Sequence, residues 1–186
     1  MEPTQLNIHH DLIEDCKSGR RSAQRKLYDL YSKAMYNTAL RIVSDQDEAE
    51  DVLQESFISA FKNLHQYRGD STFGSWMKKI VINNSLNKLK KRKLDVTPLD
   101  DEHMEVGEDM SSVNEKELIL SVQRVKQAVN ILPRGFREVF TLYQFEGYDH
   151  KEIGEILGIT ESTSKSQYNR AKKKIKSLLT QEVIYG

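Results

Sequence analysis

Residues 150–175 have the sequence HKEIGEILGITESTSKSQYNRAKKKI, which predicts two helices joined by a sharp turn. Ile153, Ile156 and Leu157 give the first helix an apolar face. Gly158 permits the turn, and Thr160 is expected to cap the second helix. Such a helix-turn-helix commonly places its second helix in the major groove of DNA, although an ordinary helical hairpin is the alternative.

The second helix of this unit has two different sides when its residues are placed at about 100° each. The side expected to be buried carries Ser164, Tyr168, Ala171, Ile175, Leu178 and Leu179. The opposite side carries hydroxyls, then an amide and a guanidinium, then lysines: Ser162, Thr163, Ser166, Asn169, Arg170, Lys173 and Lys174. Because Asn and Arg can pair with base edges while lysines neutralise phosphates, this side predicts the reading of duplex DNA.

Apolar residues recur at helical spacing along the rest of the chain, and no long strand-like alternation is present. The sequence therefore predicts an all-α protein, with helices at about 11–18, 22–43, 47–64, 73–93, 114–132, 134–146, 149–157 and 161–180. Asp11 is the expected N-cap of the first helix. The second helix is expected to bury Ala23, Leu27, Leu30, Tyr31, Ala34 and Thr38.

Formal net charge is zero, but the charges are segregated along the chain. Residues 78–93 contain seven Lys or Arg and residues 165–176 contain six, with no acid in either segment. Residues 95–117 contain nine acids and one lysine. Two basic segments separated by acids predict two DNA contacts, one in each of two domains, although solvated helix surfaces are the alternative.

The boundary between these domains is expected where the apolar period is lost. Residues 94–113 carry acids, a proline and a glycine without helical periodicity, which predicts a flexible acidic linker. The two small helical domains are then expected at 9–93 and 114–181.

The expected helix at 47–64 has an acidic side opposite its apolar side. The apolar side carries Ala49, Val52, Leu53, Ser56, Phe57, Ala60 and Leu64. Asp51, Glu55, Ile58 and Lys62 share the other side, with Asp47 and Gln54 near its edges. An isoleucine among carboxylates predicts a docking surface for a basic partner, with Ile58 as an apolar anchor. A plain solvated surface is an equally good interpretation.

The expected helix at 73–93 carries the only tryptophan of the chain. Its apolar side consists of Met77, Val81, Ile82, Leu86 and Leu89. The other side gathers amides, lysines and one isoleucine around Trp76: Lys79, Ile80, Asn83, Asn84, Asn87, Lys90 and Lys91. Because unpaired bases stack on aromatic rings while lysines follow the backbone, this side predicts binding of single-stranded DNA. Tyr67 and Phe73 flank a polar loop at 65–72 and are expected to help form a pocket for an unstacked base. A tryptophan in the core is the alternative.

Several classes of protein are disfavoured by the sequence. The chain has no apolar run long enough for a membrane span and no secretory signal pattern, and its single cysteine, Cys16, fits a reducing cytoplasm. No metal, cofactor or catalytic residue is predicted, because metal-spaced histidines, a phosphate-binding glycine loop and an activated nucleophile are missing from the sequence. A one-component or two-component regulator remains an alternative, but it needs a receiver domain or ligand pocket that no βαβ pattern here provides.

Taken in this order, these segments resemble the extracytoplasmic-function (ECF) group of the sigma-70 family of RNA polymerase sigma factors. The resemblance covers about residues 9–181. Residues 49–84, AEDVLQESFISAFKNLHQYRGDSTFGSWMKKIVINN, are similar to sigma region two. Residues 132–175, LPRGFREVFTLYQFEGYDHKEIGEILGITESTSKSQYNRAKKKI, are similar to sigma region four.

The resemblance implies a protein that binds core RNA polymerase and directs promoter recognition and melting, under the control of an anti-sigma factor. Its expected contacts with polymerase are the beta-prime clamp helices and the beta flap, and the residues implied for the clamp helices are Asp51, Gln54, Glu55 and Ile58. The residues implied for recognising and melting the minus-ten element are Tyr67, Trp76, Lys79, Asn83, Asn84 and Asn87. Those implied for the duplex minus-thirty-five element are Thr163, Lys165, Ser166, Asn169, Arg170 and Lys173.

Three positions of the recognition helix depart from the family's usual pattern. Ser164 stands where Val is common, Gln167 where Arg is common, and Tyr168 where Leu or Ile is common. Ser164 is expected to weaken packing unless its hydroxyl bonds back to the helix backbone. The family's promoter preference therefore does not transfer to this chain.

Overall fold

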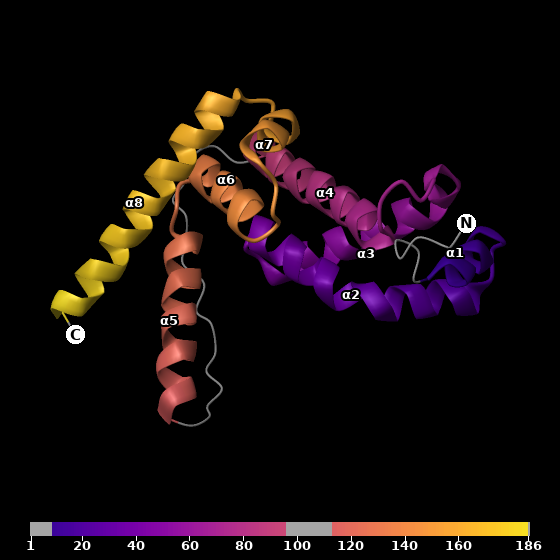
Figure 1. The fold of residues 1–186 in the computed structure, drawn as a ribbon, viewed down its shortest axis with the longest axis horizontal. Coiled ribbons are helices and arrows are strands. Elements are labelled where there is room, and N and C mark those ends of the chain that lie inside the picture. The colour runs from indigo at the N-terminus through magenta and orange to yellow at the C-terminus, as the bar shows by residue number, and fades with distance from the viewer. Residues whose placement is uncertain (1–8, 96–112, 186) are drawn as a thin grey trace, which may run out of the picture. The chain divides into compact units, whose positions relative to one another are not determined.

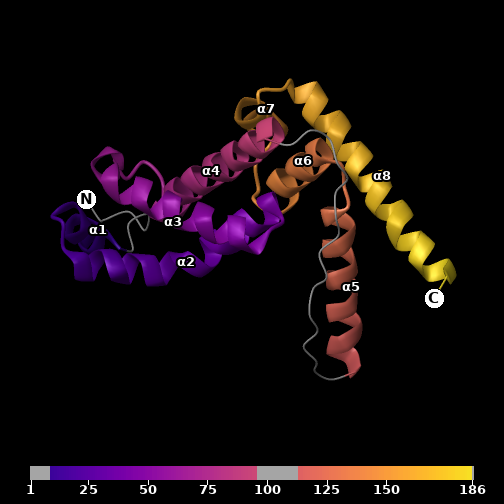
Figure 2. The ribbon, with the colours of Figure 1, turned by 180° about the vertical axis from the view of Figure 1, so that it is seen from behind.

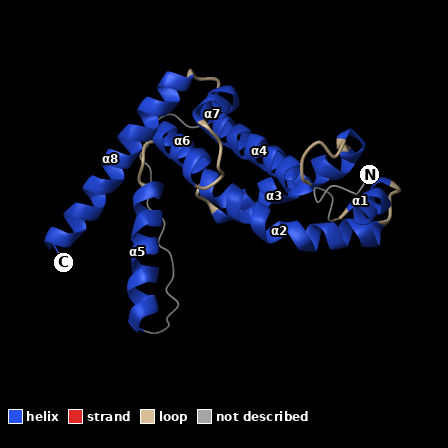
Figure 3. Ribbon diagram, viewed as in Figure 1, coloured by secondary structure: helices blue, strands red, loops and turns tan. Residues whose placement is uncertain are grey.

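The computed structural model describes residues 9–95 and 113–185, and every regular element within them is a helix (Figure 3). The all-α prediction is confirmed. The chain divides into two compact units, Met1–Thr97 and Pro98–Gly186, which are described separately. Most of the predicted acidic linker falls on residues 96–112 and lies outside the described residues.

The first unit is a helical bundle (Figures 1 and 2). Its elements are α1 (His10–Lys17), α2 (Arg21–Val43), α3 (Gln46–Lys62), a short 3₁₀ helix (Leu64–Gln66) and α4 (Phe73–Asp95). Helices α2, α3 and α4 pack on one another in every pairing, and α1 packs on α2. Asp45 caps α3, because its carboxylate accepts a hydrogen bond of 2.8 Å from the Glu48 N–H.

The predicted apolar sides of two helices form the core of this unit. All seven residues expected inside α3 and the turn that follows it are buried: Ala49, Val52, Leu53, Ser56, Phe57, Ala60 and Leu64. All five expected inside α4 are buried as well: Met77, Val81, Ile82, Leu86 and Leu89. Both predictions are confirmed.

The predicted apolar side of α2 is partly wrong. Ala23, Leu27 and Thr38 are buried as expected, but Leu30 is 54% exposed and Ala34 is exposed. The second half of the helix instead buries Met35, Ala39, Ile42 and Val43. Because α2 packs on α1, α3 and α4 at once, its buried side rotates along its length, which a single helical projection cannot describe. The predicted cap of α1 is also wrong, since the helix starts at His10 and its N-cap, His9, makes no capping bond.

The second unit contains α5 (Val113–Asn130), α6 (Arg134–Gln144), α7 (His150–Leu157) and α8 (Glu161–Tyr185). Helix α8 packs on α5, α6 and α7. One core cluster joins the end of α5 and the turn after it with α6 and α8: Ala128, Val129, Leu132, Phe140, Ala171 and Ile175. None of the helices that the structure describes is long and apolar enough to cross a membrane.

Candidate nucleic-acid interface

The helix-turn-helix is built from α7, a short turn and α8. A reciprocal pair of hydrogen bonds starts α7: the Asp149 carboxylate accepts from the Glu152 N–H at 2.8 Å, and the Glu152 carboxylate accepts from the Asp149 N–H at 2.9 Å. Gly158 ends α7 in the left-handed region, with φ 68°. Thr160 caps α8, since its hydroxyl accepts from the Thr163 N–H at 3.0 Å. The predicted turn and cap are confirmed.

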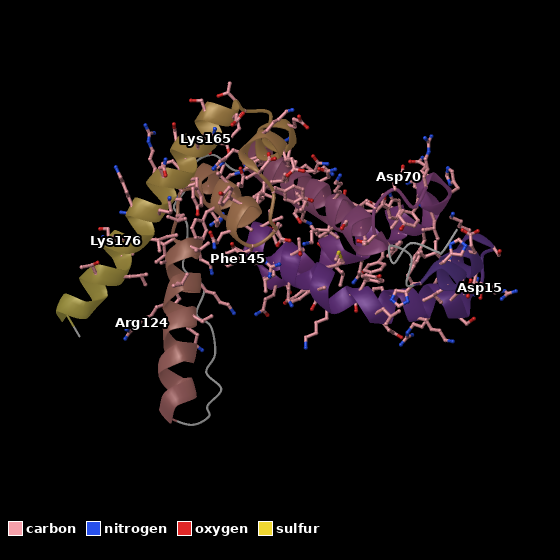
Figure 4. The ribbon with its side chains drawn as sticks, in the orientation of Figure 1. Asp15, Asp70, Arg124, Phe145, Lys165 and Lys176 are labelled. Carbon is pink, nitrogen blue, oxygen red and sulfur yellow. The ribbon has the colours of Figure 1, made fainter. Side chains whose placement is uncertain are left out.

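The side of α8 predicted to read DNA is exposed. All six side chains that the family resemblance implies for duplex reading are open to solvent: Thr163, Lys165, Ser166, Asn169, Arg170 and Lys173. Figure 4 labels Lys165 near the start of α8 and Lys176 further along the same helix. The Lys165 ammonium lies 2.5 Å from the Glu161 carboxylate, and this bond lowers the pKa of Glu161. This side therefore presents hydroxyl, amide and cationic groups together.

The opposite side of α8 carries an unexpected polar contact. Ser164 is fully buried, but its hydroxyl does not return to its own helix. It lies 2.9 Å from Nδ1 of His150, in the first turn of α7. Tyr168 is half-buried, and its ring stacks on Phe140 with centroids 5.8 Å apart. Two of the three departures from the family pattern are thus accommodated by specific partners.

The acidic side of α3 is exposed as predicted, but it is not independent of α4. Asp51, Gln54, Glu55 and Ile58 are all exposed, and Ile58 is 54% exposed. The Asp51 carboxylate accepts a hydrogen bond of 3.0 Å from the Lys88 ammonium. That bond is the largest cause of the raised pKa of Lys88, with Glu48 and Glu55 adding to it.

Trp76 lies neither free in solvent nor in the core. It is half-buried, and its ring packs on Tyr67 and Phe73 with centroids 5.5 and 5.7 Å apart. Tyr67, predicted to help form a pocket for an unstacked base, is 5% exposed, and its hydroxyl donates to the Ser71 carbonyl at 2.7 Å. The aromatic cluster thus forms a base for the indole and holds the loop that precedes α4.

The polar residues predicted around Trp76 fall into two groups. Lys79, Asn83 and Asn87 are exposed. Asn84 is half-buried, and its amide donates to the Ser56 hydroxyl of α3 at 2.9 Å. Asn84 therefore bridges α3 and α4, so its amide is less available to a ligand than the other two.

The contacts of His150, Lys88 and Arg92 were not predicted from the residue pattern. His150 lies outside the recognition helix. The one sequence feature that indicates its contact with Ser164 is a serine on the buried side of that helix with a histidine fourteen residues before it. Lys88 and Arg92 both belong to the basic segment at 78–93, and their ion pairs with α3 were not predicted. The Arg92 guanidinium lies 3.9 Å from the Glu48 carboxylate. The basic segment of α4 and the acids of α3 partly neutralise each other. No group of three potential metal ligands occurs among the residues that the structure describes.

A helix-turn-helix with an exposed basic side is typical of DNA-binding proteins. Comparison with known families gives two matches: Sigma-70 region 2 over residues 27–94 and Sigma-70 region 4 over residues 122–175. The chain belongs to the ECF group of the sigma-70 family of sigma factors.

Relatives of similar length support this assignment. The RNA polymerase sigma-H factor of Pseudomonas aeruginosa is 30% identical over 177 residues, which cover 90% of this chain and 92% of that protein. The ECF RNA polymerase sigma-E factor of Haemophilus influenzae is 29% identical over 175 residues, covering 89% and 92%.

Solved structures share the fold. The sigma factor RpoE of Bartonella quintana, in complex with the anti-sigma factor NepR, matches with a TM-score of 0.61 and 22% identity over 84% of this chain and 96% of that one. CnrH, in complex with the cytosolic domain of CnrY, matches with a TM-score of 0.56 and 22% identity over 92% and 96%.

Proposed function

We propose that this sigma factor docks on core RNA polymerase through the exposed side of α3, melts the minus-ten element on α4 and reads the minus-thirty-five element with α8. The observation that carries the proposal is the exposure of all six predicted base- and phosphate-contacting side chains on one side of a capped α8. The protein acts in the cytoplasm, and an anti-sigma factor controls its activity. The complex of RpoE with NepR supports a partner of that class.

Charge reversal on α3 tests the docking step. Replacing Asp51 and Glu55 together by lysine is expected to weaken binding to core polymerase roughly ten- to a hundredfold, because like charges then meet a basic partner. Helix content should stay unchanged, since both side chains are exposed. Fluorescence titration of the labelled protein with core polymerase measures the affinity, and circular dichroism measures the helix content.

The matched control removes the ion pair without altering the acidic side. Asp51 bonds to Lys88, so the reversal also breaks a contact inside the protein. Lys88→Gln breaks the same contact and leaves both carboxylates in place. An exposed ion pair contributes little to stability, at most about 1 kcal/mol, and Lys88→Gln should bind core polymerase like the parent. If the parent, the double reversal and Lys88→Gln bind core polymerase with equal affinity, α3 is not part of the interface.

Two basic residues of α8 are expected to play different parts in duplex reading. Arg170→Ala should relax the preference at one or two base pairs of the upstream element, because a guanidinium reads base edges. Lys173→Ala should weaken binding to all sequences alike, because its ammonium neutralises phosphate. Selection of randomised upstream duplexes by the reconstituted holoenzyme separates the two effects. The same preference profile in both variants would mean that α8 presents a different side to DNA.

A further inference from the structure

Three helices of the second unit meet at one imidazole. His150 stands in the first turn of α7, and its ring stacks on Tyr143 of α6 with centroids 4.5 Å apart and planes at 15°. On α8 it meets the Ser164 hydroxyl at 2.9 Å and the Tyr168 ring at 5.6 Å between centroids. Tyr143 and Tyr168 are themselves 4.5 Å apart between centroids. A polar group thus occupies the junction between the recognition helix and its support.

The contact between His150 and Ser164 constrains α8 more narrowly than an apolar contact would. Ser164 is fully buried, and a buried hydroxyl without a hydrogen bond is costly. The bond is directional, so α8 keeps it only within a small range of rotation about its own axis. Ser166 follows on the same turn, and Asn169 and Arg170 come one turn later. Any rotation that breaks the bond therefore redirects all the proposed base-contacting groups together.

We infer that His150 is a positioning residue of the recognition helix: its bond to Ser164 and its stack on Tyr143 fix the rotation of α8 and so aim Ser166, Asn169 and Arg170 at base edges. The inference rests on the proposed function of α8 as the reader of duplex DNA. Helices α7 and α6 then influence sequence preference although they do not contact DNA themselves.

The charges around His150 favour its neutral form. Burial lowers the pKa of the imidazole below its ordinary 6.5, and the ammonium groups of Lys165 and Lys172 lower it further, against the opposing effect of Glu161 and Asp149. The aromatic rings of Tyr143 and Tyr168 also face the imidazole. A neutral imidazole with its proton on Nε2 accepts the Ser164 hydroxyl proton at Nδ1, whereas the other tautomer donates from Nδ1 to the Ser164 oxygen.

Protonation leaves Nδ1 only as a hydrogen-bond donor and removes stability. Nδ1 of the imidazolium is a donor, so Ser164 must turn its own proton to another acceptor. The unfolded chain takes up this proton near pH 6.5, whereas the folded unit takes it up only at lower pH. The contribution to folding is therefore present above pH 6.5 and is lost as the pH falls through the folded-state pKa. The rotational constraint on α8 should weaken only as the pH falls through the lowered folded-state pKa of His150, where the folded unit takes up the proton.

Three variants test the inference in the full chain assembled with core polymerase. His150→Phe keeps a ring on Tyr143 but removes the bond, Ser164→Ala removes the hydroxyl, and the double variant removes both. Each single variant should reduce the holoenzyme's preference for its selected upstream duplex over a randomised one by about five- to tenfold. The double variant should lose no more than either single variant, because the residues act as one contact. Competition binding of the two duplexes measures the preference.

A fourth variant separates positioning from stability. In His150→Asn the side-chain oxygen can accept the Ser164 proton but does not titrate. It should retain most of the preference at pH 7.5, and its preference should change less than the parent's when the pH is lowered to about 5.5. A nuclear magnetic resonance titration of the parent should show the His150 signal moving below pH 6.5, and the Ser164→Ala variant should shift that midpoint.

Two outcomes would overturn the inference, and they are distinguishable. If His150→Phe and Ser164→Ala lower the melting temperature of the second unit but leave the preference unchanged, while Arg170→Ala alters it, His150 has only a structural role and the proposed function stands. If Arg170→Ala also leaves the preference unchanged, α8 is not the reader, and the proposed function fails together with the inference.

Discussion

Replacement of Gly154 by alanine is expected to destabilise the helix-turn-helix strongly, although glycine to alanine inside a helix usually stabilises. A Cβ built on Gly154 lies 2.8 Å from the backbone oxygen of Ile159 and 3.5 Å from the backbone nitrogen of Glu161. The obstacle is the backbone of the turn, so no side-chain rotation can relieve it. Overpacking costs typically about 1–3 kcal/mol, and a backbone obstacle belongs at the upper end of that range.

This cost exceeds the gain in helix propensity, which is about 1 kcal/mol. The net loss, about 2 kcal/mol, corresponds to a fall in melting temperature of roughly 8–16 °C for a unit of this size. Thermal unfolding followed by nuclear magnetic resonance should show the loss in signals of the second unit alone. Signals of the first unit serve as an internal reference, because the two units have separate cores.

Gly135 provides the matched control. Its added Cβ would meet only the end of the Gln167 side chain, at 3.4 Å, and that side chain can move. Gly135→Ala in α6 should therefore leave the melting temperature unchanged or raise it by a few degrees. A Gly154→Ala protein as stable as the parent would mean that the turn shifts freely, and that the contact between α7 and α8 does not fix the geometry of the motif.

The sequence predicted best those elements whose burial follows one period. Helix α3 and helix α4 each bury one continuous side, and all the residues expected there are buried. Helix α2 packs on three neighbours, so its buried side rotates, and a fixed projection misplaced Leu30 and Ala34. Periodicity records only the average direction of burial along a helix.

The candidate site was predictable as far as exposure is concerned, but its contacts were not. The exposed residues of α8 follow from the helical period together with the cap at Thr160. The pair of Ser164 with His150, and that of Asp51 with Lys88, join residues on different helices. Such pairs depend on how the helices pack, which no local pattern encodes. The burial of Tyr67 was not predictable for the same reason, since three aromatic rings bury one another.

Removal of the indole of Trp76 is expected to impair promoter melting far more than binding to polymerase. The half-buried ring rests on Tyr67 and Phe73 beside the exposed Lys79 and Asn83. Stacking of one unpaired base on an aromatic ring contributes about 1–3 kcal/mol. Trp76→Ala should therefore lower the open-complex population by roughly five- to a hundredfold when few complexes are open. Permanganate reactivity of promoter thymines in holoenzyme complexes reports that population.

Two further variants distinguish stacking from packing. Asn83→Ala removes an exposed amide beside the indole and should lower melting without a change in stability. Phe73→Leu disturbs the same aromatic cluster from a buried position but leaves the indole in place. If Trp76 acts by stacking, promoter thymines should be much less reactive with Trp76→Ala than with Phe73→Leu, even when the two variants have the same loss of melting temperature. If reactivity instead follows stability in both variants, Trp76 supports the loop and α4, and the base stacks elsewhere.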